Sequence, residues 1–121
     1  MLALIIDDDI EVMELLSSFL EQNGLDVVKS FTAEDGMKKF QTHHPEVTFL
    51  DIMLPDKSGL NLLKEMKKCN KNAPVIMVTG FKDAENVVTA FREGAFDCLL
   101  KPFNYEYLKN DILTRLKTSK K

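Results

Sequence analysis

The feature that most constrains the fold of this chain is a regular alternation between short apolar runs and longer amphipathic segments. The five apolar runs are Leu2–Ile6, Leu25–Lys29, Val47–Leu50, Pro74–Val78 and Phe96–Leu100. Four of them are almost continuously apolar, which is typical of parallel strands that are buried on both faces of a sheet. The second run contains Asp26 and Lys29, so we predict it at an edge of the sheet.

The segments between and after these runs repeat their apolar residues at helical spacing. From Val12 to Leu20 the apolar positions follow i, i+3, i+4, i+7 and i+8, and Asn23-Gly24 ends the pattern. The later segments are marked, in chain order, by Met37 and Phe40, by Leu60, Leu63 and Met66, by Val87, Val88 and Phe91, and by Tyr105, Leu108, Ile112 and Leu116. The pattern therefore predicts one helix after each strand.

Five strands that alternate with five helices predict an α/β fold with parallel strands, right-handed connections and helices on both faces. A polar second strand at the edge favours the flavodoxin-like strand order 2-1-3-4-5 of a doubly wound (β/α)5 sheet. No Pro-, Gly- or Ser-rich linker interrupts the pattern, so we expect residues 1–121 to form one domain. That domain is either complete or the N-terminal part of a longer regulator.

The composition excludes several classes of protein. Sixteen Lys and Arg residues against nineteen Asp and Glu give a net charge of −3, whereas binding to nucleic-acid phosphates needs a basic patch. No apolar run reaches the roughly 18 residues of a membrane span, and no signal-peptide pattern is present. Cys69 and Cys98 have neither CxxC spacing nor the density of a disulfide scaffold. We therefore expect a cytoplasmic domain that binds neither nucleic acid nor membranes directly.

The residues that follow the predicted strands gather chemically active groups at one edge of the sheet. In an open parallel sheet, ligands bind beyond the carboxyl ends of the strands. Strands 1 and 3 are neighbours in the predicted order, so the acidic residues after them converge. The residues at the strand ends are Asp7-Asp8-Asp9, Asp51, Thr79-Gly80 and Lys101-Pro102.

Together these groups indicate phosphoryl-transfer chemistry. Clustered carboxylates repel one another unless a cation or a proton neutralises them, and oxygen ligands without His or Cys favour Mg²⁺. Lys101 offers a positive charge for anionic oxygens, and Thr79 offers a hydroxyl donor. With Asp51 as a carboxylate nucleophile, the set can form a transient acyl phosphate.

Each of these features has a simpler explanation when it is taken alone. Aspartates after a strand commonly cap the next helix, and we predict that role for Asp9. A lone lysine is commonly solvated, and Thr79-Gly80 alone is an ordinary loop. The joint placement at four strand ends is what favours a site.

Four motifs resemble the receiver domain of bacterial two-component response regulators. They are IIDDD, VTFLDIMLPDKSGL, VIMVTG and GAFDCLLKPF, in the order and spacing of that family, and the resemblance covers nearly the whole chain. The residues of these motifs are most similar to those in the receivers of enhancer-binding transcription activators. The resemblance implies a phosphorelay domain that is phosphorylated by a sensor histidine kinase. Such a domain assists only its own phosphorylation and dephosphorylation, so we do not expect it to be an enzyme.

The resemblance also implies roles for the acidic residues. Asp51 would be the phosphoacceptor and a ligand of Mg²⁺. Asp8 would bind the ion directly, Asp7 mostly through water, and the main-chain carbonyl of Met53 would be a further ligand.

The remaining implied roles concern the switch. Lys101 would contact the phosphoryl group, with a cis bond to Pro102, and Thr79 would move toward it. The loop of residues 79–84 would then shift and alter the surface of helix 4, strand 5 and helix 5, which binds an output domain or a downstream protein, expected to act in transcription regulation. We expect a monomer or a phosphorylation-linked homodimer. The residues expected on that surface are Arg92, Glu93, Asp97 and Tyr105.

One position departs from the family pattern. Three residues before the lysine the family usually carries Tyr or Phe, whose ring turns inward on activation, whereas this chain has Cys98. A small thiol cannot act as that rotating aromatic group. By strand alternation, Phe96 would share the face of Cys98 and partly cover it.

The residues alone leave three alternative functions open. A receiver-like interaction module without phosphorylation is compatible with Cys98. A Mg²⁺-dependent aspartyl-phosphate hydrolase is suggested by Asp7-x-Asp9, which mimics the nucleophile motif of haloacid-dehalogenase-like phosphatases, although Ile10 follows it and the chain is short for that fold. A flavodoxin-like FMN protein would need a hydroxyl- and glycine-rich loop after strand 1, where this chain has three aspartates.

Overall fold

The structure is a computed structural model that describes residues 1–80 and 84–119. Its strands are β1 (Leu2–Ile6), β2 (Asp26–Ser30), β3 (Val47–Asp51), β4 (Val75–Thr79) and β5 (Asp97–Leu100). Its helices are α1 (Ile10–Gln22), α2 (Ala33–His43), α3 (Gly59–Cys69), α4 (Ala84–Arg92), α5 (Tyr105–Tyr107), the π-helical η1 (Leu108–Leu113) and α6 (Thr114–Ser119).

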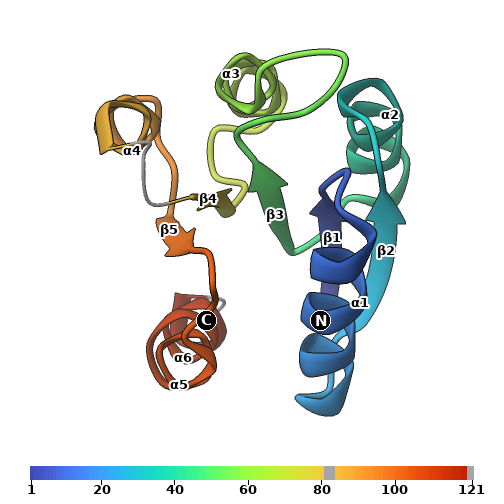
Figure 1. Cartoon of the computed structure of the whole chain (residues 1–121), viewed down its shortest axis with the longest axis vertical. Helices are drawn as coiled ribbons and strands as arrows, with labels where there is room; N and C mark the ends of the chain where they lie inside the picture. The colour runs from blue at the N-terminus through green and yellow to red at the C-terminus, as the bar shows by residue number, and fades with distance from the viewer. Residues whose placement is uncertain (81–83, 120–121) are drawn as a thin grey trace.

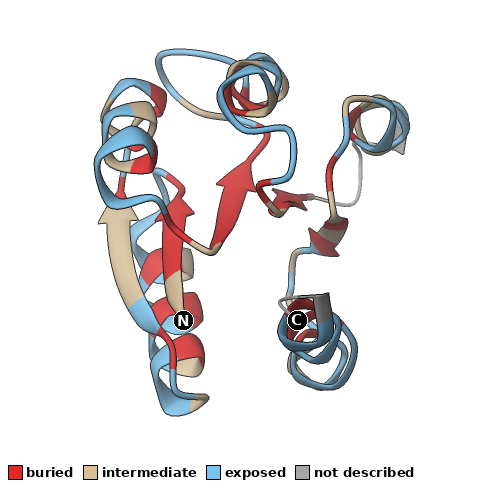
Figure 2. Cartoon of the chain, turned by 180° about the vertical axis from the view of Figure 1, so that it is seen from behind, coloured by how far each residue is buried: buried red, intermediate tan, exposed pale blue. Residues whose placement is uncertain are grey.

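The strands form one parallel sheet in the order β2-β1-β3-β4-β5 (Figure 1). This confirms the predicted fold class and strand order. Four of the five strands differ from the prediction by a single residue at one or both ends; β2, for example, runs over Asp26–Ser30. Figure 2 shows β3 buried throughout and β2 mostly half-buried, as expected for a central and an edge strand.

Two apolar layers hold the sheet between its helices. One face packs against α1, η1 and α6, and the other against α2, α3 and α4 (Figure 1). Side chains alternate between the layers along each strand, so that Ile5 belongs to the first layer and Leu4 and Ile6 to the second. This double burial explains why the central strands are almost continuously apolar.

Side-chain caps fix where the first three helices begin. The carboxylate of Asp9 accepts hydrogen bonds from the backbone amides of Glu11 and Val12, which confirms its predicted role as the N-cap of α1. Thr32 caps α2 and Ser58 caps α3 in the same way. The caps of α1 and α3 lie next to the carboxyl edge of the sheet, so they also fix the direction in which the chain leaves that edge.

The last helix differs from the predicted regular helix. It begins at Tyr105 as α-helix, widens into the π-helical turns of η1, and returns to α-helix at Thr114. The buried side chains Leu108, Ile112 and Leu116 still face the core. Among the described residues, no helix is long and apolar enough to cross a membrane.

Candidate functional site

The acidic residues after β1 and β3 lie together at the carboxyl edge of the sheet. Ile6 pairs with Leu50 in the β1–β3 register, which brings the residues that follow them next to each other. Carboxylate oxygens of Asp7, Asp8 and Asp51 all lie within 4.8 Å of one another. The convergence that the strand order predicted is therefore present.

Asp7 is buried and held by its own backbone. Its side chain accepts a hydrogen bond from the backbone amide of Asp9 (2.9 Å) at Oδ1, and its own amide donates to Ser30 O at the end of β2. Within the described part of the chain, Asp7 Oδ2 is buried without a hydrogen bond, although Lys101 Nζ forms an ion pair with it at 3.2 Å. Asp8, by contrast, is exposed to solvent.

Asp51 ends β3 and is 5% exposed. The backbone amide of Met53 donates a hydrogen bond to its Oδ1 (3.2 Å). Burial, followed by the charge of Asp7, raises the pKa of Asp51 to about 6, while Lys101 and the amide of Met53 act in the opposite direction. The side chain is thus a buried carboxylate whose negative charge is costly without a cation.

Lys101 follows β5 and reaches both buried carboxylates. Its Nζ lies 3.2 Å from Asp7 Oδ2 and 3.6 Å from Asp51 Oδ2. Burial acts to lower the pKa of Lys101, but the charges of Asp51 and Asp7 outweigh it and raise that pKa. The bond between Lys101 and Pro102 is cis, as the resemblance implied.

Thr79 ends β4 and is 1% exposed. Its hydroxyl donates a hydrogen bond to Gly80 O (3.3 Å), and its carbonyl accepts one from the amide of Lys101 (2.9 Å). The backbone therefore joins the hydroxyl-bearing residue to the lysine-bearing residue. Part of the loop 79–84 that we expected to move, residues 81–83, lies outside the described residues.

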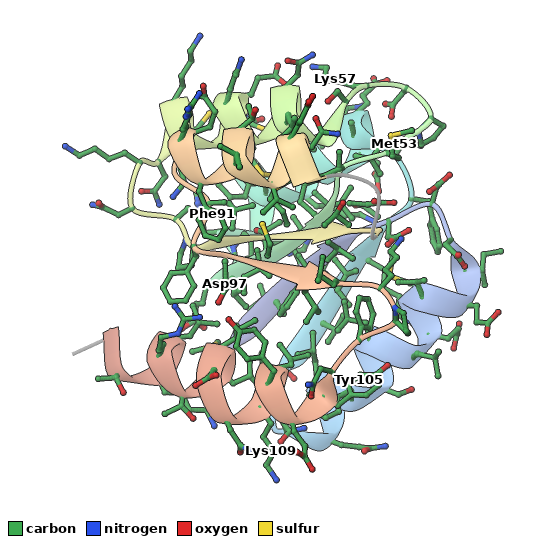
Figure 3. All side chains as sticks on the ribbon, turned by 60° about the vertical axis from the view of Figure 1, so that its left-hand side comes forward. Met53, Lys57, Phe91, Asp97, Tyr105 and Lys109 are labelled. Carbon is green, nitrogen blue, oxygen red and sulfur yellow. The ribbon has the colours of Figure 1, made fainter. Side chains whose placement is uncertain are left out.

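Met53 lies in the loop that leads from β3 to α3, beside Asp51. Its backbone forms an isolated antiparallel bridge with Ser58, and its side chain is 69% exposed. Figure 3 places Met53 and Lys57 on the same loop, above the carboxyl edge of the sheet. The role of the Met53 carbonyl as a metal ligand stays a prediction.

The residues present fit a hard divalent cation. Three carboxylates converge, the donors are all oxygen, and Asp7 Oδ2 is a buried acceptor without a hydrogen bond among the described residues. A divalent cation would satisfy that oxygen and neutralise the charges that raise the pKa of Asp51. The set is the one that Mg²⁺ prefers in proteins.

The expected output surface needs three corrections. Asp97 is buried, and it accepts hydrogen bonds from the hydroxyl of Tyr107 (2.6 Å) and from Arg115. Tyr105 packs on the ring of Phe19 of α1 (4.6 Å between ring centroids), so its side chain faces α1 and not the surface of α4 and β5 (Figure 3). The aromatic residue that accompanies β5 is thus Tyr107, which sequence reasoning missed.

Phe96 does not cover Cys98. Phe96 precedes β5, so strand alternation does not apply to it, and its ring packs with the α1 and η1 layer, under the guanidinium of Arg115 (4.9 Å). Cys98 packs with the opposite layer. Burial, together with the charge of Asp97, raises the pKa of the Cys98 thiol to about 11.

Fold and site together define a doubly wound domain with an acidic pocket, a half-buried lysine and a buried threonine at the carboxyl edge of the sheet. The chain belongs to the response regulator receiver domain family, whose model matches residues 3–113. This is a family of two-component signalling domains rather than of enzymes, and its members bind Mg²⁺ at an acidic pocket and interact with histidine kinases and output domains. Membership therefore disfavours the phosphatase and FMN alternatives.

Several curated relatives are transcriptional regulators. A CpxR homolog of Haemophilus influenzae is 37% identical over 114 residues, which cover 94% of this chain and 48% of the relative. The regulatory protein AtoC of Escherichia coli is 34% identical over 105 residues, covering 87% of this chain and 23% of the relative. The chain thus spans about a quarter to a half of the length of these relatives.

Solved structures agree with the fold. A CheY-like receiver domain protein of Methanospirillum hungatei superposes with a TM-score of 0.91 at 32% identity, covering 98% of this chain and 95% of the other. NtrX of Brucella abortus, in a complex with ADP, gives a TM-score of 0.91 at 33% identity, covering 98% of this chain and 27% of the other. The resemblance that the motifs indicated is confirmed.

Proposed function

We propose that Asp51 accepts a phosphoryl group from a sensor histidine kinase in a Mg²⁺-dependent reaction. A lone pair of an Asp51 oxygen forms the new O–P bond while the bond between phosphorus and the kinase imidazole nitrogen breaks, and that electron pair stays on the nitrogen. The observation that carries the proposal is the buried Asp51 carboxylate, grouped with Asp7 and Asp8 within 4.8 Å and with Lys101 Nζ at 3.6 Å.

Each residue of the site contributes a distinct function to this reaction. Asp7, Asp8, Asp51 and the Met53 carbonyl would hold Mg²⁺, with Asp7 acting mostly through water, and the ion supplies positive charge against the phosphoryl oxygens. Lys101 Nζ, already paired with Asp51, would turn toward the added phosphoryl oxygens. Burial of the pocket strengthens these charge interactions relative to those in bulk water.

The output follows from the same residues. A phosphoryl group adds negative charge and acceptor oxygens, which attract the hydroxyl of Thr79 and change the surface formed by α4, β5 and α5. That surface carries the exposed apolar side chains Val88, Phe91, Leu100 and Tyr107. We propose that it binds an output domain or a downstream protein in transcription regulation, inside the cytoplasm, and that the domain acts as a monomer or as a phosphorylation-linked homodimer.

The test is the intact mass of the protein after incubation with acetyl phosphate and Mg²⁺. We expect one added phosphoryl group in the wild type and none in Asp51→Asn or with a chelator. Asp26→Asn is a matched control, since Asp26 is exposed at the opposite end of the sheet, and it should be labelled like the wild type. No gain in the wild type under any condition would instead favour an interaction module that works without phosphorylation.

Thr79→Ala tests the switch separately from the chemistry. The variant should gain the phosphoryl group at Asp51, because the threonine hydroxyl is not the nucleophile. Binding of the output partner should respond less to phosphorylation than in the wild type. A response equal to that of the wild type would exclude Thr79 from the switch.

A further inference from the structure

The two halves of the acidic pocket belong to different strand ends. The pairing of β1 with β3 places Asp51 beside Asp7, and one side chain outside the pocket also links the loop after β3 to the β1 side. Asp7 and Asp8 follow β1, whereas Asp51 and Met53 belong to β3 and the loop after it. The spacing between these halves decides whether their oxygens can share one cation. Asp56, in the β3–α3 loop, extends to α2, which packs against the β1 side.

Asp56 makes two long-range hydrogen bonds with the first turn of α2. Its Oδ1 accepts from the backbone amide of Ala33 (2.8 Å), and its Oδ2 accepts from the amide of Glu34 (3.0 Å). Thr32 provides partners for the next two amides of the helix through its hydroxyl and its carbonyl. Asp56 thus completes the capping of α2 from a segment more than twenty residues away in the sequence.

Helix α2 is in turn fixed to the end of β1. A Cβ at Gly36 would lie 2.5 Å from Ile6 Cδ1, so the helix backbone packs directly on the residue before Asp7. Asp35 Oδ2 accepts a hydrogen bond from the Ser30 hydroxyl (2.7 Å), and Ser30 O accepts one from the amide of Asp7 (3.0 Å). A chain of contacts therefore runs from Asp56 through α2 to Asp7.

The other end of the loop is held locally. Gly59 N donates to Ile52 O (2.7 Å), and Met53 forms a backbone bridge with Ser58. These contacts tie the loop to itself and to α3, but they do not join it to α2 or to β1. Asp56 supplies the hydrogen bonds from the loop to α2.

We propose that Asp56 is a positioning residue that fixes the β3–α3 loop against α2 and thereby sets the affinity of the pocket for Mg²⁺. This inference deepens the proposed function and rests on it. Asp56 neither touches the reacting atoms nor belongs to the acidic cluster. It acts by holding the Met53 carbonyl at a constant distance from Asp7 and Asp8, whereas the pairing of β3 with β1 already fixes Asp51.

The test compares the Kd for Mg²⁺ in Asp56→Ala, Asp56→Asn and Lys57→Ala with that of the wild type. Each Kd is measured by titration with Mg²⁺ from the amide chemical shifts of the isotope-labelled protein. In Asp56→Ala we expect the Kd for Mg²⁺ to rise about fivefold, less than the roughly 10–100-fold lost when a direct partner of a metal ligand is removed. Asp56→Asn should restore part of the affinity, because its carbonyl oxygen still accepts one amide hydrogen bond. Lys57→Ala removes the neighbouring ion pair with Glu65 (2.7 Å) and should leave the Kd unchanged.

Hydrogen exchange of the Ala33 and Glu34 amides shows whether the contact has been removed, and circular dichroism shows that each variant is folded. Faster exchange in Asp56→Ala with an unchanged Kd would overturn the inference, as would an equal rise of the Kd in Lys57→Ala. Magnesium binding is measured without phosphorylation. A wild type that binds Mg²⁺ but gains no phosphoryl group would thus refute the proposed phosphotransfer while leaving the role of Asp56 to be decided by its own variants.

Discussion

Gly59→Ala should destabilise the protein and disturb the pocket at the same time, because α3 begins against the backbone of Asp51. A Cβ at Gly59 would lie 2.0 Å from Asp51 O and 2.8 Å from Ile52 Cα. An ordinary contact needs about 3.4 Å, so the two backbones must separate by roughly 1.4 Å. A shift of that size also breaks the 2.7 Å hydrogen bond from Gly59 N to Ile52 O.

The expected loss in the free energy of unfolding is the sum of these two effects. Overpacking of this kind costs about 1–3 kcal/mol and the lost hydrogen bond about 1 kcal/mol, so we expect the free energy of unfolding to fall by about 2–4 kcal/mol. Urea denaturation followed by far-ultraviolet circular dichroism measures the change, and acetyl phosphate labelling of Asp51 should slow in parallel.

Gly24→Ala is a suitable control for this experiment. Gly24 has a φ of +87° but nothing within 4 Å of its Cβ position, so the alanine adds backbone strain of about 1–2 kcal/mol without a steric clash. Its labelling rate should match that of the wild type. If Gly59→Ala lost less stability than Gly24→Ala and labelled normally, the close approach would not matter and the reasoning would fail.

Three further predictions concern titratable groups. Burial raises the pKa of Asp51 to about 6, so ionisation of this carboxyl lowers the free energy of unfolding as the pH rises from about 4 to about 6, and the full loss is present above pH 6. In metal-free buffer, Asp51→Asn should therefore be more stable than the wild type by about 1–3 kcal/mol at pH 7 and equally stable below pH 4. Equal stability at pH 7 would contradict this. The Cys98 thiol, with a pKa of about 11, should be alkylated far more slowly than the exposed Cys69 at pH 8, and its rate should rise about tenfold per pH unit up to pH 10; peptide mass mapping would reveal a pH-independent rate if the idea were wrong. The hydrogen bond to Asp97 is the largest cause that raises the pKa of Tyr107 to about 12, so Asp97→Asn in a Tyr105→Phe background should lower that pKa toward 10, as measured by tyrosinate absorbance, and an unchanged titration would show that burial is the cause.

The sequence was sufficient to predict the sheet and the gathering of the pocket residues. Apolar runs such as Val47–Leu50 are buried on both faces because helices cover both faces, which is a property that a one-dimensional pattern records directly. The strand order then placed Asp7 next to Asp51 without any knowledge of side-chain geometry. Whether Lys101 approaches both carboxylates depends on its rotamer, so the pattern predicted its presence but not the ion pairs.

Contacts between distant segments were beyond the reach of the same reasoning. Asp56 follows a proline in a loop, and nothing local indicates that its carboxylate caps a helix more than twenty residues earlier. Tyr105 and Tyr107 differ by two residues in an apparently regular helix, and only the tertiary contacts assign Tyr105 to α1 and Tyr107 to β5. The widening of the last helix leaves no mark in the apolar spacing, since Leu108, Ile112 and Leu116 fit an α-helix equally well.

The π-helical turns of η1 have a consequence for the angles at which Tyr107 and Arg115 leave the helix. Each residue of an α-helix turns the chain by about 100°, so two residues eight positions apart would diverge by about 80°. A π turn absorbs one residue without advancing the helix, which reduces the effective separation to seven positions and the divergence to about 20°. Both side chains can therefore meet Asp97. A chain shortened by one residue within Leu108–Leu113 would keep that alignment as a regular α-helix, whereas one lengthened by a residue would turn Arg115 away from Asp97.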